Sequence, residues 1–151
     1  MSGVKVTRVE AAGSDISAYR ELRKMLWPMS DEENSRQTLE QLAASEKWAV
    51  FLGRGDDGKP VGFVEVRLRE YAEGASSSPV GFLEGWYVIP EARCQGVGRT
   101  LVESGESWAR SKECTEMGSN TEIERTGSIG AHKRLGYEEV ERQVCFLKRL
   151  A

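Results

Sequence analysis

The stretch Glu91–Thr100, EARCQGVGRT, decides how this sequence is interpreted. Two glycines, Gly96 and Gly98, stand two residues apart, Arg93 precedes them, and an apolar run ending in a proline lies just upstream. Glycines let a backbone approach a ligand closely, and the first amides of a helix bind anions. The stretch is therefore typical of a phosphate-binding loop at the start of a helix.

Three phosphate-binding motifs compete for this stretch. A Walker A loop requires GxxxxGK[ST], but Gly98 is followed by arginine and threonine, and the first glycine is misplaced. A dinucleotide fingerprint requires a third glycine near Leu101, a place directly after the first strand and an acidic partner further on, none of which is present. The third motif, Arg93-x-x-Gly96-x-Gly98 after a strand and a proline, fits a pyrophosphate. Glycines that serve only tight helix packing are the alternative.

Length and composition are those of one globular domain over residues 1–151. The chain is 39% hydrophobic and 30% charged with a net charge of −3, and its length can bury a core without disulfides. The negative charge argues against nucleic-acid binding, and the lack of a long apolar window or a signal-peptide core argues against a membrane protein. Three cysteines without a CxxC pair and one histidine argue against a metal site. We expect a cytoplasmic protein with reduced thiols.

Periodicity along the chain predicts an α+β domain. Strands are expected at 4–10, in a hairpin at 48–70, and at 80–90, 114–120 and 137–150; helices are expected at 14–28, 30–45, 97–112 and 126–136. Ser14 is expected to cap the first helix, and Ser30 with Glu33 has the spacing of a capping box for the second. Hairpins followed by a late strand–helix–strand crossover predict helices over a mixed, mostly antiparallel sheet.

The order of these motifs resembles the GNAT superfamily of N-acetyltransferases, in which an Arg/Gln-x-x-Gly-x-Gly/Ala loop follows a strand such as YVIP (87–90). Three further stretches are similar to the small bacterial aminoglycoside 6′-N-acetyltransferases: LRKMLWP (22–28), SSSPVGFLEGWYVIP (76–90) and LGYEEVER (135–142). The resemblance implies a single acetyltransferase domain with a GNAT-type sheet splayed at the signature strand. It also implies a homodimer that transfers an acetyl group from acetyl-CoA to the 6′-amino group of aminoglycosides and so confers antibiotic resistance.

The resemblance implies how acetyl-CoA is bound. A bulge splays the signature strand from its neighbour, and the pantetheine arm lies in the gap against the backbones of Trp86, Tyr87 and Val88. The Val88 N–H would polarise the thioester carbonyl as a single oxyanion donor. Arg125 stands where relatives have a small polar residue that touches CoA, and its guanidinium could reach a phosphate instead. The residues expected at the pyrophosphate are Arg93, Gln95, Gly96, Val97, Gly98 and Arg99.

Glu84 stands in the middle of an otherwise apolar strand. A carboxylate there is costly unless it is paired or solvated. One interpretation is a side chain that points into solvent. The other places it at the opening of the sheet, where it would hold the substrate ammonium and accept its proton, directly or through water. An amine must lose a proton before it attacks a thioester, so an anion there suits the chemistry.

The resemblance also implies which residues contact the aminoglycoside. Its several ammonium groups on a sugar scaffold need carboxylates and aromatic faces, and the family's contacts fall at Trp27, Tyr71, Glu84, Asn120 and Glu141. Core packing explains Trp27 about as well, and exposed packing explains Tyr71. Asn120 replaces the usual aspartate, and because an amide cannot neutralise an ammonium, affinity or drug spectrum is expected to differ.

His132, in GAHKRLG (130–136), stands where many N-acetyltransferases place a tyrosine that protonates the departing CoA thiolate. A histidine can donate a proton there, and simple packing at a helix end is the alternative. The cysteines are taken as structural, and no base adjoins Cys94, the one closest to the cofactor, in sequence, so direct attack in a ternary complex is favoured over an acyl-cysteine intermediate. Two other functions stay open: acetylation of a polyamine or peptide lysine, and acyl-CoA binding without catalysis.

Overall fold

The structure is a computed structural model that describes residues 3–30 and 38–151. The chain divides into two compact units, Met1–Ser119 and Asn120–Ala151. The sheet and the helices α1, α2 and α3 belong to the first unit, and α4 belongs to the second. Within the described ranges no helix has both the length and the apolar character needed to cross a membrane.

Among the described residues, one sheet is formed by the strands β1 Lys5–Arg8, β2 Trp48–Arg54, β3 Pro60–Arg69, β4 Val80–Val88 and β5 Met117–Ser119, in that order. Neighbours from β1 to β4 are antiparallel, and β4 pairs with β5 in parallel. The predicted mixed, mostly antiparallel sheet is confirmed. Gly58, at the tip of the β2–β3 hairpin, has a φ of +80°, which suits the glycine of the predicted turn.

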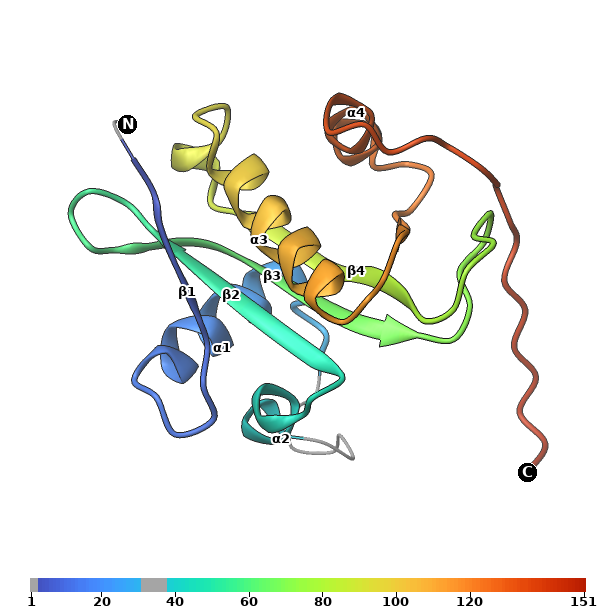
Figure 1. The fold of residues 1–151 in the computed structure, drawn as a ribbon, viewed down its shortest axis with the longest axis horizontal. Coiled ribbons are helices and arrows are strands. Elements are labelled where there is room, and N and C mark those ends of the chain that lie inside the picture. The colour runs from blue at the N-terminus through green and yellow to red at the C-terminus, as the bar shows by residue number, and fades with distance from the viewer. Residues whose placement is uncertain (1–2, 31–37) are drawn as a thin grey trace. The chain divides into compact units, whose positions relative to one another are not determined.

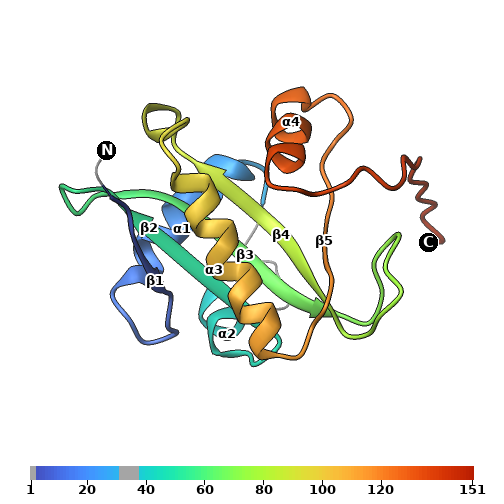
Figure 2. The same cartoon turned by 45° about the horizontal axis from the view of Figure 1, so that its top comes forward.

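Helices cover both faces of this sheet (Figures 1 and 2). The helix α3 Val97–Ser111 packs across β3 and β4 on one face, and α1 Asp15–Leu26 and α2 Leu39–Ala44 pack on the other. The central strand β3 is covered by helices on both faces, so side chains on both of its faces are buried. Phe63 contacts Tyr19 of α1 on one face, and Val66 lies against Gly105 of α3 on the other.

The helix α1 begins where expected, but not by the predicted cap. Ser14 is the N-cap residue, and its side chain makes no capping hydrogen bond. Asp15, the first helical residue, instead accepts a hydrogen bond of 2.9 Å from Thr7 Oγ1 and pairs with Arg54. A carboxylate in the first turn favours the helix through the dipole, so a tertiary contact replaces the local cap.

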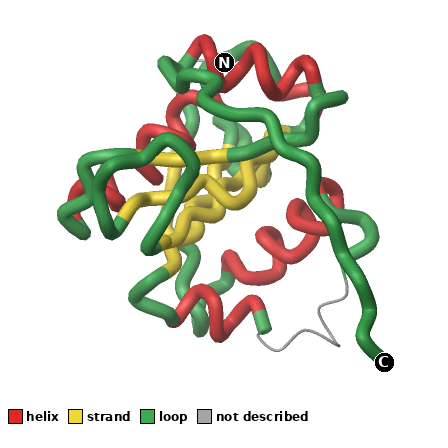
Figure 3. The backbone as a smooth tube through the Cα atoms, turned by 90° about the vertical axis from the view of Figure 1, so that its right-hand side faces the viewer, coloured by secondary structure: helices red, strands yellow, loops and turns green. Residues whose placement is uncertain are grey.

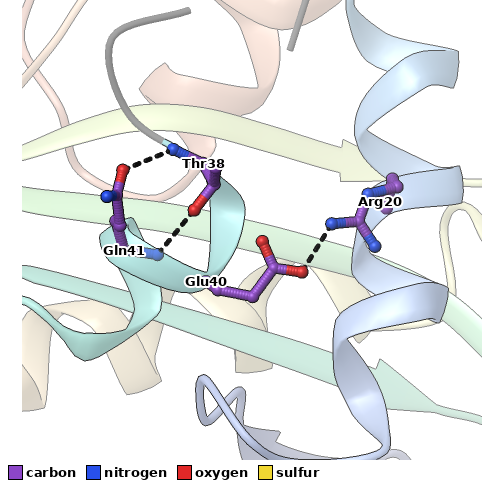
Figure 4. Close-up of polar contacts among 4 residues, drawn as sticks. All are labelled: Arg20, Thr38, Glu40 and Gln41. Atoms are coloured by element: carbon purple, nitrogen blue, oxygen red, sulfur yellow. Dashed lines mark hydrogen bonds and ion pairs between the residues drawn. The ribbon is translucent and has the colours of Figure 1, made fainter. Parts of the chain in front are cut away.

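The helix α2 is capped by Thr38 and Gln41 (Figure 4). The backbone N–H of Gln41 donates to Thr38 Oγ1 at 3.2 Å, and the backbone N–H of Thr38 donates to Gln41 Oε1 at 2.9 Å. The predicted box of Ser30 and Glu33 involves the range 31–37, which lies outside the described residues. Among the described residues, the part of the predicted helix that the structure shows is Leu39–Ala44, with Thr38 as its N-cap.

The second unit contains α4 Thr126–Arg134, which ends before Gly136 at a φ of +91°. The predicted closing strands at 137–150 are wrong in this structure: the segment carries neither helix nor strand (Figure 3). Val144, Phe146 and Leu147 are 77%, 91% and 82% exposed. Apolar β-formers give a segment strand propensity, but a strand needs a neighbouring backbone to accept its hydrogen bonds, and periodicity does not supply one.

Candidate active site

Glu84 is the extra residue of a β-bulge between β3 and β4. Glu65 lies opposite Gly85 and Val66 lies opposite Leu83, so no residue of β3 is left to face Glu84. A bulge bends its strand and re-aims a side chain. The bulge expected from the family resemblance is therefore present, and the carboxylate that stood out in the sequence is at its centre.

The sheet opens beside the bulge on the other flank of β4. β5 pairs with β4 only from Gly81, opposite Met117, to Leu83, opposite Ser119. Beyond Leu83, no strand within the described ranges continues the pairing on this flank. The second half of β4, which is the signature strand, thus has an open edge, as the predicted splaying of the sheet at this strand requires.

The Val88 amide points toward this open flank. Ile89 N donates to Val61 O at 2.9 Å, which makes these two residues a hydrogen-bonded pair. In an antiparallel ladder such pairs alternate with pairs whose N–H and C=O groups point away from each other. Gly62 and Val88 form the next pair, so the amide and carbonyl of Val88 are directed away from β3.

The same alternation determines the direction in which the other backbone amides of β4 point. Trp86 directs its amide to the open flank like Val88, whereas Tyr87 directs its amide to β3. Arg93 folds back on this strand: its Nε donates to the Val88 carbonyl at 2.8 Å, and its guanidinium lies 5.7 Å from the centre of the Tyr87 ring. Arg93 therefore connects the glycine loop to the end of β4.

The glycine loop forms the start of α3. Gly96 is the N-cap at a φ of +85°, a left-handed conformation that glycine adopts readily. The first helical hydrogen bond runs from Thr100 N to Gly96 O at 3.1 Å, so the amides of Val97 and Gly98 precede the ladder at the positive end of the helix. A Cβ on Gly98 would lie 3.0 Å from the Trp86 ring. The two glycines thus satisfy different needs, a backbone turn and a close approach.

Two other residues expected at the pyrophosphate have side chains at the surface. Gln95 is exposed and donates from Nε2 to the Glu91 carbonyl at 3.1 Å. Arg99 is exposed on the first turn of α3. The loop therefore combines helix amides with an arginine at its exposed face, and this chemistry fits a pyrophosphate.

The Glu84 carboxylate is paired with two arginines of β3. Its Oε1 lies 2.8 Å from Arg67 Nε and accepts a hydrogen bond of 2.8 Å from Arg69 Nε. The Arg69 guanidinium lies 3.6 Å from the centre of the Phe82 ring, and that of Arg67 lies 5.4 Å from the centre of the Trp48 ring. Ion pairs with stacked guanidiniums offset the cost of placing a carboxylate, 18% exposed, in this strand.

Sequence reasoning missed these arginines, although a signal was present. Glu65, Arg67 and Arg69 alternate at a period of two in FVEVRLR, so they share one face of β3. That face is the one that α1 covers, because Glu65 bonds to Arg23 of α1. Attention to charged residues at strand period would have indicated a polar cluster beside Glu84.

Trp27 lies against the bulge. Its ring stacks under the Arg23 guanidinium at 4.7 Å and meets Phe63 edge-on at 6.5 Å. A Cβ on Gly85 would lie only 2.6 Å from the Trp27 indole. The structure therefore brings Trp27 next to the residue that follows Glu84. Tyr71, by contrast, is 65% exposed in the loop after β3.

The remaining expected site residues lie in the second unit. Asn120 and Glu141 are exposed. Arg125 is 50% exposed at the N-cap of α4, with its Nε 4.0 Å from Glu122 Oε2. Their roles at the substrate or CoA stay predictions.

His132 is held within α4. Its Nδ1 lies 2.7 Å from the Ser128 carbonyl, and its ring meets Tyr137 edge-on at 5.8 Å. A carbonyl only accepts, so Nδ1 carries the hydrogen and Nε2 is the acceptor of a neutral ring. His132 could therefore give a proton from Nε2 only as an imidazolium.

An opened mixed sheet, a bulge with a carboxylate and a glycine-capped helix are the arrangement of an N-acetyltransferase that uses acetyl-CoA. The chain belongs to the acetyltransferase (GNAT) family, whose model matches residues 16–137. The resemblance expected from the glycine loop is confirmed, and acetyl-CoA is the co-substrate.

Individual relatives show which members of the family this chain is similar to. The chain is 44% identical over 138 residues to an aminoglycoside N(6′)-acetyltransferase type 1 of Stenotrophomonas maltophilia, covering 91% of this chain and 89% of the relative. It superposes on AAC(6′)-Iy in complex with the bisubstrate analogue CoA-S-monomethyl-acetylneamine with a TM-score of 0.90 at 34% identity, covering 98% and 99% of the two chains. For AAC(6′)-Ih of Acinetobacter baumannii the TM-score is 0.88 at 31% identity, covering 99% and 100%. The expected similarity to the aminoglycoside subgroup is confirmed.

Proposed function

We propose that this chain transfers the acetyl group of acetyl-CoA to the 6′-amino group of aminoglycosides and thereby confers resistance. The observation that carries the proposal is the bulge at Glu84, which lies beside Trp27 at the point where the sheet opens. It combines an anion and an aromatic face, the two features that an aminosugar needs. The family membership and the relatives named above support the same acceptor.

Acetyl-CoA would bind along the open edge of β4. The Trp86 and Val88 backbones would replace the missing strand for the pantetheine arm, and the amides of Val97 and Gly98 would bind the pyrophosphate. The Val88 amide points to the open flank, so it is suited to donate to the thioester oxygen as negative charge develops there.

Transfer would occur by direct attack within the ternary complex. The ammonium of the acceptor gives a proton to Glu84, directly or through water, and the neutral amine attacks the thioester carbon. The C–N bond forms as the C–S bond breaks, and the CoA thiolate leaves with the electron pair of the C–S bond. His132 as an imidazolium, or water, returns a proton to the sulfur. The amide nitrogen loses its second proton to solvent.

The acceptor is tested by measuring thiol release from acetyl-CoA with kanamycin or tobramycin, and by locating the new acetyl group in the product by NMR. We expect turnover with acetylation at the 6′ nitrogen. Spermidine and a lysine-containing peptide serve as competing acceptors. Turnover of these amines, with the drugs acting only as inhibitors, would replace the proposal with the second function left open by the sequence. Tight CoA binding without thiol release from any amine would favour a binding module.

Resistance is tested in a susceptible bacterial host. Expression of the chain is expected to raise the inhibitory concentration of aminoglycosides that carry a 6′-amino group. Drugs with a 6′-hydroxyl in the same series are the control, because they offer no acceptor nitrogen. An equal rise for both groups would point to another mechanism.

We also propose that two copies of the chain associate and that the protein works in the cytoplasm. The exposed Val144, Phe146 and Leu147 support association, because apolar side chains of this size gain stability when a second copy covers them. Cys94, Cys114 and Cys145 are free thiols, which suits a reducing compartment. Light scattering is expected to give a dimer mass that falls when Phe146 and Leu147 are changed to lysine. A wild-type monomer would contradict association.

A further inference from the structure

We infer that Glu65 is a positioning residue of the acceptor site, which holds Arg23 against Trp27 and so fixes the indole beside Glu84. The inference rests on the proposed function, since it assigns Trp27 to the wall of the acceptor site. Glu65 itself touches neither substrate.

Glu65 is buried beneath α1, in the middle of β3. It is 1% exposed, the one charged or polar side chain in the buried set of the described residues. Its Oε1 accepts hydrogen bonds of 2.5 Å from Tyr19 OH and of 2.5 Å from Arg23 Nε. Burial raises the pKa of the Glu65 carboxyl, against the opposing effects of Arg23 and Tyr19. A group this costly to bury needs a reason to be there.

The contacts of Glu65 form a closed ring around the bulge. Arg23, which Glu65 binds through Nε, stacks on the Trp27 ring at 4.7 Å. The indole in turn rests on Gly85, where a Cβ would approach to 2.6 Å. Gly85 is the ladder partner of Glu65. The ring runs from β3 through α1 to β4 and returns to β3, so each member restricts the others.

The position of Glu65 is better explained by a role in orienting Arg23 and Trp27 than by a contribution to the stability of the fold. An apolar residue of similar size would fill the place beneath α1 without the cost of burying a charge. It would not bind the guanidinium, and Arg23, 21% exposed, would be free to turn to solvent. Trp27 ends α1, where its backbone already departs from helical geometry. The orientation of its ring therefore depends on its contacts with Arg23, Gly85 and Phe63. Among these three, Arg23 is the one that Glu65 holds.

The kinetic test compares Glu65→Gln with Arg20→Gln. Glutamine keeps the size of Glu65 and loses its charge. Arg20 lies one turn before Arg23 on α1 and binds Glu40 of α2 at 2.7 Å (Figure 4), and Glu40 is not a member of the ring. Glu65→Gln is expected to raise the KM for the aminoglycoside by about three- to tenfold, the range of one lost cation–π contact. The KM for acetyl-CoA and kcat should change less than about twofold, as should all three constants in Arg20→Gln.

The structural test uses 5-fluorotryptophan incorporated in the four tryptophans and fluorine NMR of the free protein. Trp27→Phe assigns the Trp27 resonance. Glu65→Gln is expected to shift or broaden that resonance and to leave those of Trp86 and Trp108 in place. This spectrum needs no turnover, so it distinguishes failure of the inference from failure of the proposed acceptor. If Glu65→Gln does not fold, the partly exposed Arg23 is changed to Gln, with the same expectations.

An unaltered Trp27 resonance in a folded variant would overturn the inference. So would a KM that rises equally for both substrates, because a general loss of packing would then explain the effect. A change in drug KM alone, together with a change at Trp27 alone, would establish the positioning role.

Discussion

Glu84 Oε1 accepts a hydrogen bond of 2.8 Å from Nε of Arg69, which lies on the neighbouring strand. Arg67 pairs with the same oxygen at 2.8 Å. An ammonium that binds Glu84 must therefore share the carboxylate with two guanidiniums. The two guanidiniums offset the negative charge of the Glu84 carboxylate, so this position is less anionic than the resemblance alone would imply.

Glu84→Gln is expected to lower kcat/KM for the aminoglycoside by about tenfold or more, because the variant lacks the carboxylate that we propose as the proton acceptor for the substrate ammonium. The measurement is steady-state thiol release as a function of pH. The acidic limb of the wild-type profile should move or disappear in the variant. An unchanged pH profile would rule out Glu84 as the base. Thermal unfolding of the same sample checks that the loss of both arginine pairs has not unfolded the site.

Gly85→Ala is expected to raise the KM for the aminoglycoside, because the new Cβ would lie 2.6 Å from the Trp27 indole and displace it. The KM for acetyl-CoA should not change. Gly127→Ala is the matched control, since a Cβ there meets nothing within 4 Å. Equal effects of the two substitutions on the drug KM would show that Trp27 is not part of the acceptor site.

Gly96→Ala is expected to weaken CoA binding, measured by calorimetry. Its φ of +85° disfavours alanine by about 1–2 kcal/mol, so the loop must either store this strain or move its amides. Gly58→Ala carries a similar strain at a φ of +80°, in the hairpin turn. Both variants should lose thermal stability, and only Gly96→Ala should lose affinity for CoA. Unchanged affinity for CoA in Gly96→Ala would count against the glycine loop as the pyrophosphate-binding site.

Cys114 is expected to react with a thiol reagent much more slowly than Cys94 and Cys145. It is 6% exposed, whereas the other two are exposed, and burial raises the pKa of the Cys114 thiol, so less thiolate forms. Titration with a disulfide reagent at mildly alkaline pH should show two fast thiols and a third that reacts after denaturation. Three thiols of equal rate in the native protein would contradict the packing of Cys114.

Glu116 is expected to make stability depend on pH. Hydrogen bonds from the Ser77 hydroxyl and from the amides of Ser76 and Ser77 lower the pKa of Glu116 below its ordinary 4.5. A lowered folded-state pKa stabilises the protein above the unfolded value, and this stability is lost as pH falls through the folded value. Glu116→Gln should therefore lower the Tm near neutral pH and differ less from wild type in acid. A pH-independent difference would assign the effect to geometry rather than charge.

Much of the fold was predictable from local patterns. The hairpin at 48–70 and the helix at 97–112 correspond to β2–β3 and α3, because turn glycines and helical periodicity act over a few residues. The strands at 137–150 did not form, since a strand requires a partner that lies outside its own sequence. Ser14 does not cap α1 through its side chain; Asp15, the first residue of that helix, instead pairs with Arg54 of β2.

By itself, the sequence determined the glycine loop, the signature strand and the presence of a carboxylate at Glu84, because each depends on residue type and spacing along a short segment. Only the tertiary structure decided that Glu84 bulges out beside Gly85, that Arg67 and Arg69 bind it, and that Glu65 reaches Trp27 through Arg23. These relationships join β3, β4 and α1, and side chains from separate elements meet only when the burial of apolar surface brings those elements together.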